Sequence, residues 1–155
     1  MSHPVYINAL GKFLPGEPVS NDEMENHLGL VGGKPSRLKS RILKQNGIQS
    51  RYYAIDSEGR VLFRDYELAA QAVLDALKHS ELSLKEIQYL AAATSQSDLL
   101  APGFASLVQG ELHLPACEIA SLHGVCASGM MALKGAHLQI QAGEKDSVTI
   151  NFCGF

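Results

Sequence analysis

The fold of this chain is decided by the stretch Ser121-Leu122-His123-Gly124-Val125-Cys126-Ala127-Ser128-Gly129-Met130. An apolar run over residues 115–122 precedes the turn in this stretch, and residues 127–142 are mostly small or apolar. Because glycine marks a tight turn between two such runs, the pattern predicts a strand, a turn at Gly124 and a buried helix. Cys126 then falls at the first residues of that helix.

This position suggests a chemical role for Cys126. Backbone N–H groups at a helix N-terminus have no partners within the helix and carry partial positive charge. They favour the thiolate form of a cysteine, and the thiolate is the nucleophile. The neighbouring glycines and small side chains leave room for a substrate carbonyl. The alternative is that Cys126 is an inert, small core residue among alanine, valine and methionine.

Composition places the chain among ordinary globular proteins. It has 155 residues, of which 46% are hydrophobic and 19% charged, and this length predicts one domain. The formal net charge of −3 offers no electrostatic argument for binding nucleic acid or a membrane surface.

One segment is nevertheless strongly basic, with Lys34, Arg37, Lys39, Arg41 and Lys44 close together. It is either a solvated helix face or a docking surface for an anionic partner, such as a phosphate-bearing cofactor or an acidic carrier protein.

The cysteines indicate a reducing compartment. Cys117, Cys126 and Cys153 are odd in number and have no CxxC spacing, so we expect reduced thiols in a cytoplasmic protein and no zinc site. His123 lies three residues before Cys126, but two ligands do not make a structural metal site. The N-terminal residues lack a signal-peptide pattern, and no apolar stretch reaches the ~20 residues that a membrane span needs.

Strand and helix patterns alternate along the chain, which predicts an α/β layered fold with a parallel-rich sheet. Residues 87–94 are apolar without alternation, so both faces of this strand should be buried. Capping boxes at Ser20–Glu23 and Ser83–Glu86 predict helix starts. Strands are predicted at 5–10, 48–55, 87–94, 117–122 and 147–152, and helices near 20–29, 36–44, 66–79, 104–112 and 127–142.

Five short motifs, in order and at the right spacing, resemble the 3-oxoacyl-[acyl-carrier-protein] synthase III family of the thiolase-like superfamily. The nucleophile turn Gly124-Val125-Cys126-Ala127-Ser128-Gly129 is similar to the family's A-x-C-A/S-G. The other four are Ala9-Leu10-Gly11-Lys12-Phe13-Leu14-Pro15, Ser20-Asn21-Asp22-Glu23-Met24, Asn46-Gly47-Ile48-Gln49-Ser50-Arg51 and Ala92-Ala93-Thr94-Ser95.

The resemblance implies a thiolase-like fold of which residues 1–155 form the N-terminal half-domain, with the break in or after the strand at 147–152 and the C-terminal half absent. It implies a cytoplasmic acyltransferase that needs no bound cofactor. Cys126 would take an acyl group from acyl-CoA or acyl-carrier protein, and malonyl-carrier protein would then lose CO₂ and attack the acyl-enzyme. The Cys126 N–H would form half of the oxyanion hole.

Three departures from the family qualify this expectation. The family's catalytic His and Asn, and its second oxyanion-hole glycine, lie in the C-terminal half. Arg41 stands near the place of a tryptophan that stacks on coenzyme A, and Gln45 stands where an arginine is usual. With Arg51, these residues would mark the acyl-donor entrance, and the missing tryptophan and arginine favour a carrier-bound donor. The third departure is that the segments 30–34 and 96–102 are longer than usual, as in relatives that make resorcinol or polyketide products.

Other functions and roles stay open from the sequence. The chain could belong to a resorcinol- or ester-forming relative, or be a non-catalytic dimerisation or acyl-binding subunit. His123 is interpreted as structural rather than as a general base. Met130 and Met131 are interpreted as core fillers rather than as the wall of an acyl pocket. We expect the chain to associate, as a homodimer or with a complementary half, through strand residues 116–122 and the apolar face of the helix at 127–142.

Overall fold

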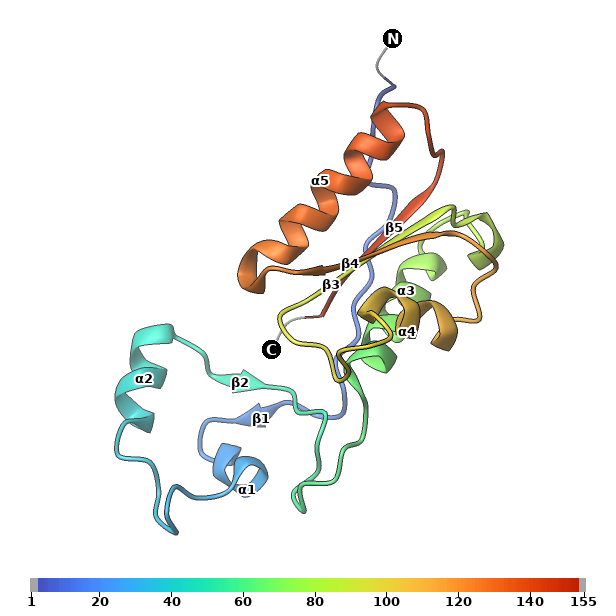
Figure 1. Ribbon diagram of the computed structural model, residues 1–155. Helices are drawn as coiled ribbons and strands as arrows, with labels where there is room; N and C mark the ends of the chain where they lie inside the picture. Colours follow the sequence, from blue (N-terminus) through green and yellow to red (C-terminus); the bar gives the residue numbers. More distant parts are fainter. Residues whose placement is uncertain (1–2, 154–155) are drawn as a thin grey trace. The chain divides into compact units, whose positions relative to one another are not determined.

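The computed structural model describes residues 3–153, which form two compact units. The sheet unit comprises residues 3–13 and 65–153, and the small unit comprises residues 14–64 (Figure 1). Of the small unit's residues, all of which are described, only Pro15 and Val19 are buried. The expected single domain therefore has one substantial core, which lies in the sheet unit.

That core is built on a three-stranded parallel sheet of order β4-β3-β5. The central strand β3 covers Tyr89–Thr94, and β4 (Glu118–His123) and β5 (Val148–Cys153) flank it. All six residues of β3 are buried, which confirms the prediction from its unbroken apolar pattern. A strand between two neighbours and two helical layers needs apolar side chains on both faces.

The register of the sheet brings the carboxyl ends of all three strands to one edge. Thr94 pairs with His123 on one side and with Cys153 on the other. Ligand sites in open α/β sheets form beyond the carboxyl ends of the strands. The turn that carries Cys126 follows β4 at this edge.

Helices cover both faces of the sheet, as Figure 1 shows. Helices α3 (Asp65–Lys78) and α4 (Phe104–Glu111) pack on one face around Leu90 and Ala92 of β3. Helix α5 (Ser128–Gln141) packs on the other face. The 3₁₀ turn η1 (Leu84–Glu86) leads into β3 and has the predicted capping box.

Helix α5 lies close to the sheet because the facing side chains are small. Ala132 and Ala136 are buried against Ala91 and Ala93 of β3. The opposite face of the helix is open to solvent, where Met130, Met131 and Leu138 are each half exposed or more. The helix is therefore buried along its sheet side only, and the interpretation of Met130 and Met131 as core fillers is wrong.

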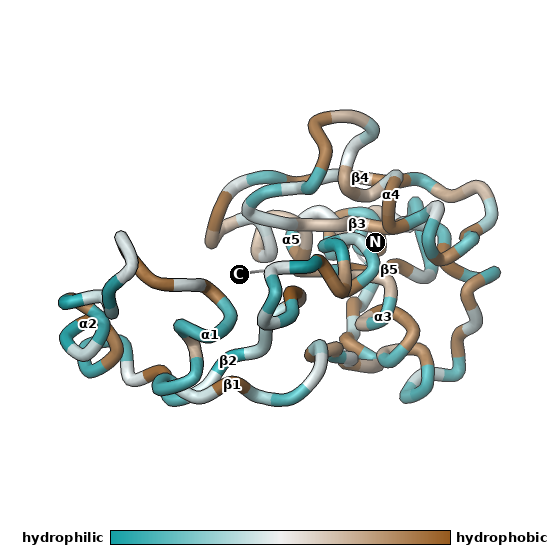
Figure 2. Tube along the Cα trace, turned by 90° about the horizontal axis from the view of Figure 1, so that it is seen from below, coloured by the Kyte–Doolittle hydropathy of each residue, from teal (hydrophilic) through white to brown (hydrophobic). Residues whose placement is uncertain are grey.

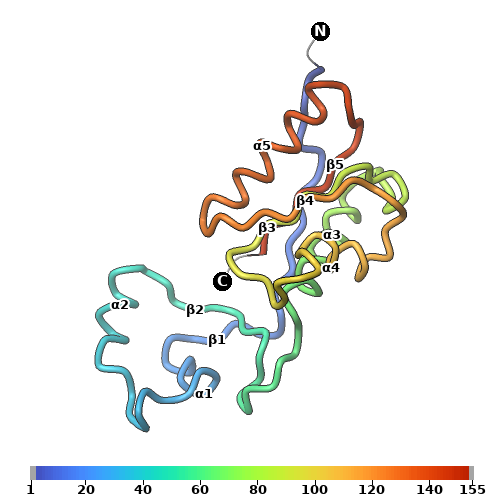
Figure 3. Tube along the Cα trace, viewed as in Figure 1, coloured from blue at the N-terminus to red at the C-terminus, as the bar shows by residue number. Residues whose placement is uncertain are grey.

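The small unit contains little regular structure (Figure 3). Strands β1 (Val19–Ser20) and β2 (Ser50–Arg51) pair antiparallel, and helices α1 (Met24–Leu28) and α2 (Lys39–Asn46) lie between them in the chain. Gly47, with φ of 70°, ends α2 in the left-handed conformation that glycine adopts without strain. Hydrophilic residues predominate in α2, whereas hydrophobic residues are frequent in the sheet unit (Figure 2).

The strand predicted at residues 5–10 is wrong. No strand forms there among the described residues, and the side chains of Tyr6, Ile7 and Leu10 are exposed. The segment instead runs to α3, where a Cβ on Gly11 would lie 2.2 Å from the Ala76 nitrogen. A residue without a side chain is needed at that approach, and no hydrogen-bonding partner strand is present to order the residues before it.

Three other boundaries differ from the predictions in the small unit. Extended pairing over 48–55 is confined to β2 and one isolated bridge at Ile55. Helix α2 starts at Lys39 rather than at Ser36. Helix α1 starts at Met24. The Glu23 carboxylate accepts the Ser20 N–H at 3.2 Å, as the predicted capping box requires, but the Ser20 hydroxyl donates to the same carboxylate at 2.6 Å and caps no backbone N–H.

Helix α4 receives its N-terminal cap from a distant strand. The Ser121 hydroxyl on β4 accepts a hydrogen bond from the Ala105 N–H at 2.8 Å. We expect Ser121→Ala to lower the free energy of unfolding by about 1 kcal/mol, because the N–H loses its acceptor. Chemical denaturation checks this, with Ser121→Thr as the control that keeps the hydroxyl. Equal losses in both variants would contradict a capping role.

Candidate functional site

Cys126 lies in the short connection between β4 and α5. A 3₁₀ turn, η2 (Val125–Ala127), holds Cys126 two residues before α5 begins at Ser128. The side chain of Cys126 is exposed. The predicted placement of this cysteine, between the end of a strand and the start of the helix, is confirmed.

The backbone of the turn is strained and firmly held. Val125 has φ of 49°, a left-handed conformation that costs a β-branched residue on the order of 1–3 kcal/mol. The Ala127 N–H donates to the Gly124 carbonyl at 3.0 Å, and the buried Ser128 hydroxyl donates to the Val125 carbonyl at 2.7 Å. Such strain persists where surrounding contacts enforce it, and here it presents Cys126 to solvent.

Two apolar side chains close in on the glycines beside this turn. A Cβ on Gly124 would lie 3.2 Å from the Met131 sulfur, and a Cβ on Gly129 would lie 2.9 Å from the ring of Phe152. A side chain at Gly129 would displace the Phe152 ring, whereas the flexible Met131 side chain could shift to admit one at Gly124. Met131 and Phe152 are both about half exposed, so they present apolar surface near Cys126.

The other two thiols have different surroundings. Burial raises the pKa of Cys153 to about 11, and the nearby carboxylates of Asp65 and Asp98 add to this. Burial also raises the pKa of the partly buried Cys117, and a hydrogen bond from Gln109 offsets part of this increase. Both thiols are thereby kept protonated at neutral pH.

We expect Cys126 to react with iodoacetamide at pH 7 at least tenfold faster than Cys117 or Cys153, because Cys126 is exposed, Cys117 is partly buried and Cys153 is buried, and burial raises the pKa of the latter two thiols. Peptide mapping after timed labelling measures this, with Cys126→Ser as the control. Faster labelling of either other cysteine in the folded chain would overturn the expectation.

The residues predicted at the donor entrance lie in the small unit. Arg41 and Gln45 are both exposed and stand one helical turn apart on α2. Arg51 lies in β2, where its guanidinium donates to the Asn21 side chain. One nitrogen of that guanidinium, Nη1, is buried without a partner. Arg51 thus has a structural contact, and its role toward a donor stays a prediction.

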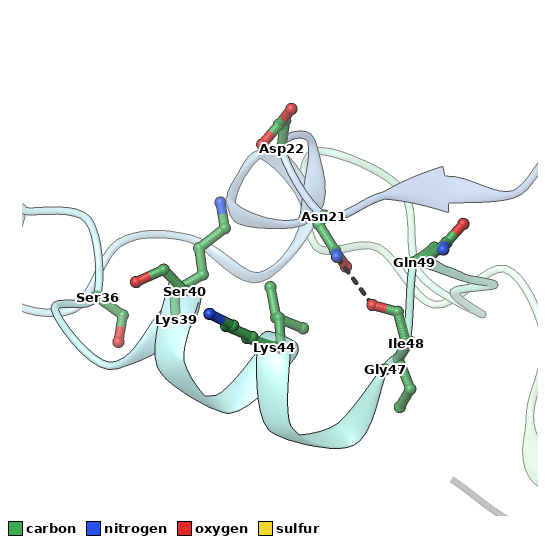
Figure 4. Close-up of a pocket in the computed structure, with 10 residues that line it drawn as sticks. Asn21, Asp22, Ser36, Lys39, Ser40, Lys44, Gly47, Ile48 and Gln49 are labelled. Atoms are coloured by element: carbon green, nitrogen blue, oxygen red, sulfur yellow. Dashed lines mark hydrogen bonds between the residues drawn. The ribbon is translucent and has the colours of Figure 1, made fainter.

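A cavity of about 490 Å³ lies on another face of α2, within the small unit (Figure 4). The Asn21 amide crosses to the Ile48 carbonyl at 2.8 Å, and the Lys39 ammonium pairs with Glu25 at 3.0 Å. Its lining surface is mixed polar and apolar, and none of the three predicted entrance residues contributes to it. Its lining residues are Asn21, Asp22, Ser36, Lys39, Ser40, Leu43, Lys44, Gly47, Ile48 and Gln49.

Sequence reasoning missed a buried carboxyl group beside Cys153. Asp65, the first residue of α3, is 4% exposed, and neither of its carboxylate oxygens has a hydrogen-bond partner among the described residues. Burial, and then the adjacent carboxylate of Asp98, raise the pKa of Asp65 to about 6. The Asp98 carboxylate accepts the Asp65 N–H at 3.1 Å across 33 residues of sequence, so no local pattern could have revealed the pair.

Within residues 3–153, no three or more His, Cys, Asp or Glu side chains are arranged to hold a metal ion. In the same part of the chain, no helix has both the length and the apolar character needed to cross a bilayer.

Comparisons with known proteins bear on the family and the fold of the chain. No family model matches the chain. The β-ketoacyl-[acyl-carrier-protein] synthase III of Dinoroseobacter shibae is 29% identical over 97% of this chain and 43% of its own length. That of Cereibacter sphaeroides is 31% identical over 93% of this chain and 41% of its own length. The chain is related to the N-terminal half of the synthase III family.

Solved structures show that the fold is the thiolase-like one of synthase III. The synthase III of Aquifex aeolicus covers 95% of this chain with a TM-score of 0.77 and 22% identity, and the chain covers 44% of it. A tetronic acid condensing enzyme, AbyA1, covers 94% with a TM-score of 0.79 and 23% identity, and the chain again covers 44% of it. The chain spans about two-fifths of the length of the curated synthase III relatives that it matches.

Proposed function

We propose that this chain is the nucleophile-bearing half of a synthase III-type condensing enzyme, an acyltransferase that forms a carbon–carbon bond in fatty-acid or polyketide synthesis. The observation that carries the proposal is the exposed thiol of Cys126, which a strained turn presents between β4 and α5. An inert core cysteine would be buried, whereas Cys126 is accessible at the carboxyl edge of a parallel sheet.

In the proposed first half-reaction, the Cys126 thiolate attacks the carbonyl carbon of an acyl thioester. The tetrahedral intermediate carries its negative charge on oxygen, to which backbone N–H groups such as that of Cys126 donate. The carbon–sulfur bond to the donor then breaks, and the donor thiolate leaves and takes up a proton. The product is an acyl-Cys126 thioester.

In the second half-reaction, malonyl-carrier protein loses CO₂, and the electron pair of the broken carbon–carbon bond becomes a carbanion. The carbanion attacks the acyl-Cys126 carbonyl, and the Cys126 thiolate leaves. We propose that the hydrogen-bond donors for the malonyl thioester lie in a complementary half, which pairs with the open face of α5. The active assembly would be cytoplasmic and dimeric, and it would need no bound cofactor.

The donor entrance is proposed to include Arg41, Gln45 and Arg51. Arg41 and Gln45 are free on the surface of α2 to contact an incoming donor. With arginine and glutamine at these positions and no tryptophan in the chain, the proposal favours an acyl group delivered on a carrier protein over one delivered on coenzyme A.

Acylation of the thiol tests the proposal most directly. On incubation with an acyl thioester, the chain is expected to gain the mass of one acyl group on the peptide that contains Cys126. Cys126→Ser should lose this product, whereas Cys117→Ser should retain it. Intact-mass and peptide measurements decide the matter, and acylation that persists in Cys126→Ser would refute the assignment.

The same preparation is expected to form no 3-oxoacyl product from malonyl-carrier protein. Decarboxylation requires hydrogen-bond donors at the malonyl thioester carbonyl, and none is assigned within this chain. Product chromatography checks this. As a control, adding the C-terminal half of a synthase III relative, which would supply the missing donors, is expected to restore condensation. Condensation by the chain alone would assign the missing role to a local group such as His123.

A scaffold role is the alternative from another class of function. A dimerisation or acyl-binding subunit would bind acyl thioesters without a covalent product. The absence of acylated Cys126 alongside retained binding would favour it. An ester- or resorcinol-forming relative would instead acylate Cys126 and differ only in the later product.

A further inference from the structure

The peptide group between Val125 and Cys126 is held in one orientation by Ser128. The Ser128 hydroxyl donates to the Val125 carbonyl at 2.7 Å, and the Ser128 backbone N–H donates to the same oxygen. The Ser128 side chain is fully buried. The Val125 carbonyl is therefore directed at the interior of the sheet unit, where two donors fix it.

This orientation also fixes the direction of the Cys126 N–H. The carbonyl of one residue and the N–H of the next belong to the same planar group, and in a trans peptide they point in opposite directions. The peptide between Val125 and Cys126 is trans. The Cys126 N–H consequently points away from the buried Ser128 hydroxyl, and it donates to no acceptor within residues 3–153.

The conformation of Val125 adds to this argument. Its φ of 49° is unfavourable for a β-branched residue. Val125 is also 63% exposed, so burial of its side chain does not offset the cost, whereas the two hydrogen bonds to its carbonyl do. Strain of this kind persists where the surrounding contacts enforce it, and it is concentrated at functional sites.

We propose that Ser128 is a positioning residue for acyl transfer. Its hydroxyl holds the Val125 carbonyl inward, and this keeps the Cys126 N–H free for the oxygen of the acyl thioester that Cys126 attacks. The inference rests on the proposed function. Hydrogen-bond donors stabilise the negative charge of a tetrahedral intermediate best when they are oriented before the reaction begins, and the buried hydroxyl supplies that orientation.

Two reactions of the same thiol test this role in Ser128→Ala. Acylation of Cys126 by an N-acetylcysteamine thioester develops negative charge on a carbonyl oxygen, whereas alkylation by iodoacetamide places the charge on the departing iodide. We expect acylation to slow by at least about fivefold, a fraction of the ~10²–10³ that loss of an oxyanion donor costs. Alkylation should stay within about twofold of the unaltered rate, because neither the exposure nor the pKa of the thiol depends on this orientation.

The ratio of the two rates is the decisive quantity, since a general structural change would alter both. Ser121→Ala is the matched control, because it also removes a hydroxyl that bonds to the backbone of the sheet unit, at Ala105. Its ratio should equal that of the unaltered chain. Ser128→Thr keeps a hydroxyl and should retain a higher ratio than Ser128→Ala. An unchanged ratio in Ser128→Ala, or the same fall in Ser121→Ala, would overturn the inference.

The solvent exposure of the Cys126 amide proton separates this inference from the proposed function. With a soluble paramagnetic agent, NMR should show strong relaxation of this proton in the unaltered chain. Weaker relaxation is expected in Ser128→Ala, because the peptide group can then turn its N–H inward. If this difference is present but the unaltered chain is not acylated, the proposed function is refuted and the positioning of the N–H stands. Acylation without the difference would refute the positioning alone.

Discussion

Replacing Asp65 with asparagine is expected to raise the free energy of unfolding at pH 7 by as much as about 3 kcal/mol. Asp65 is 4% exposed, and its pKa is raised from 3.8 to about 6 by burial and by the neighbouring Asp98 carboxylate. A buried ionised carboxylate without hydrogen-bond partners destabilises the folded state. Asparagine has nearly the same shape and carries no charge, so the part of the penalty that comes from ionisation disappears.

The sign of the pH dependence follows from the raised pKa. Between pH 4 and 6, the unfolded chain releases the Asp65 proton while the folded chain retains it, so stability falls as pH rises. Well below pH 3.8 both states are protonated, so the penalty is absent there. It grows through the window from about pH 4 to 6 and is nearly complete at pH 7, at about 1.4 kcal/mol per pKa unit.

Denaturant unfolding of Asp65→Asn and the unaltered chain at pH 4, 5, 6 and 7 measures this difference. Glu111→Gln is the control, because it removes one exposed negative charge from the same unit. The control should change stability by less than about 0.5 kcal/mol at every pH. A stability gain for Asp65→Asn that is the same at pH 4 and pH 7 would contradict the titration of a buried carboxyl group.

Phe104→Ala is expected to destabilise the sheet unit by about 3–5 kcal/mol, a large part of the roughly 5–15 kcal/mol that stabilises a typical domain. Phe104 is fully buried at the start of α4. It belongs to the core between α3, α4 and β3, together with Leu90 and Val108. Removing the ring leaves a cavity that a packed α/β layer fills only partly.

Unfolding curves of Phe104→Ala, Phe104→Leu and Phe152→Ala at equal protein concentration test this expectation. Leucine retains most of the apolar volume, so its loss should be clearly smaller than that of alanine. Phe152 is 52% exposed, and its removal should cost less than half as much as removal of Phe104. Comparable losses for Phe104→Ala and Phe152→Ala would show that the core is not organised around Phe104.

The elements that follow a local pattern could be predicted from the sequence. The unbroken apolar run of β3, the repeating alanines of α3 and the small residues of α5 each specify an element through side chains within a few turns of one another. The glycine turn before Cys126 belongs with them, so the position of the candidate nucleophile follows from the local sequence. The basic character of residues 34–44 could also be predicted, because it follows from the local composition, which has five basic and no acidic residues.

Features that depend on distant partners were decided by the tertiary structure. Residues 5–10 have a strand's composition, but a strand needs a hydrogen-bonded neighbour, and the segment instead leads to the glycine contact with α3. Ser121 caps a helix that begins 17 residues before it in the chain. Neither contact leaves a trace in local periodicity.

The candidate site likewise has features that follow from the local sequence and features that depend on packing. Local patterns suffice to place a cysteine between a parallel strand and a helix, since hydrophobic periodicity and a glycine turn act over a few residues. The exposure of Cys126, the burial of Cys153 and the meeting of Asp65 with Asp98 beside Cys153 arise from tertiary packing. Burial and pKa depend on which segments pack together, and packing joins residues that the chain itself keeps far apart.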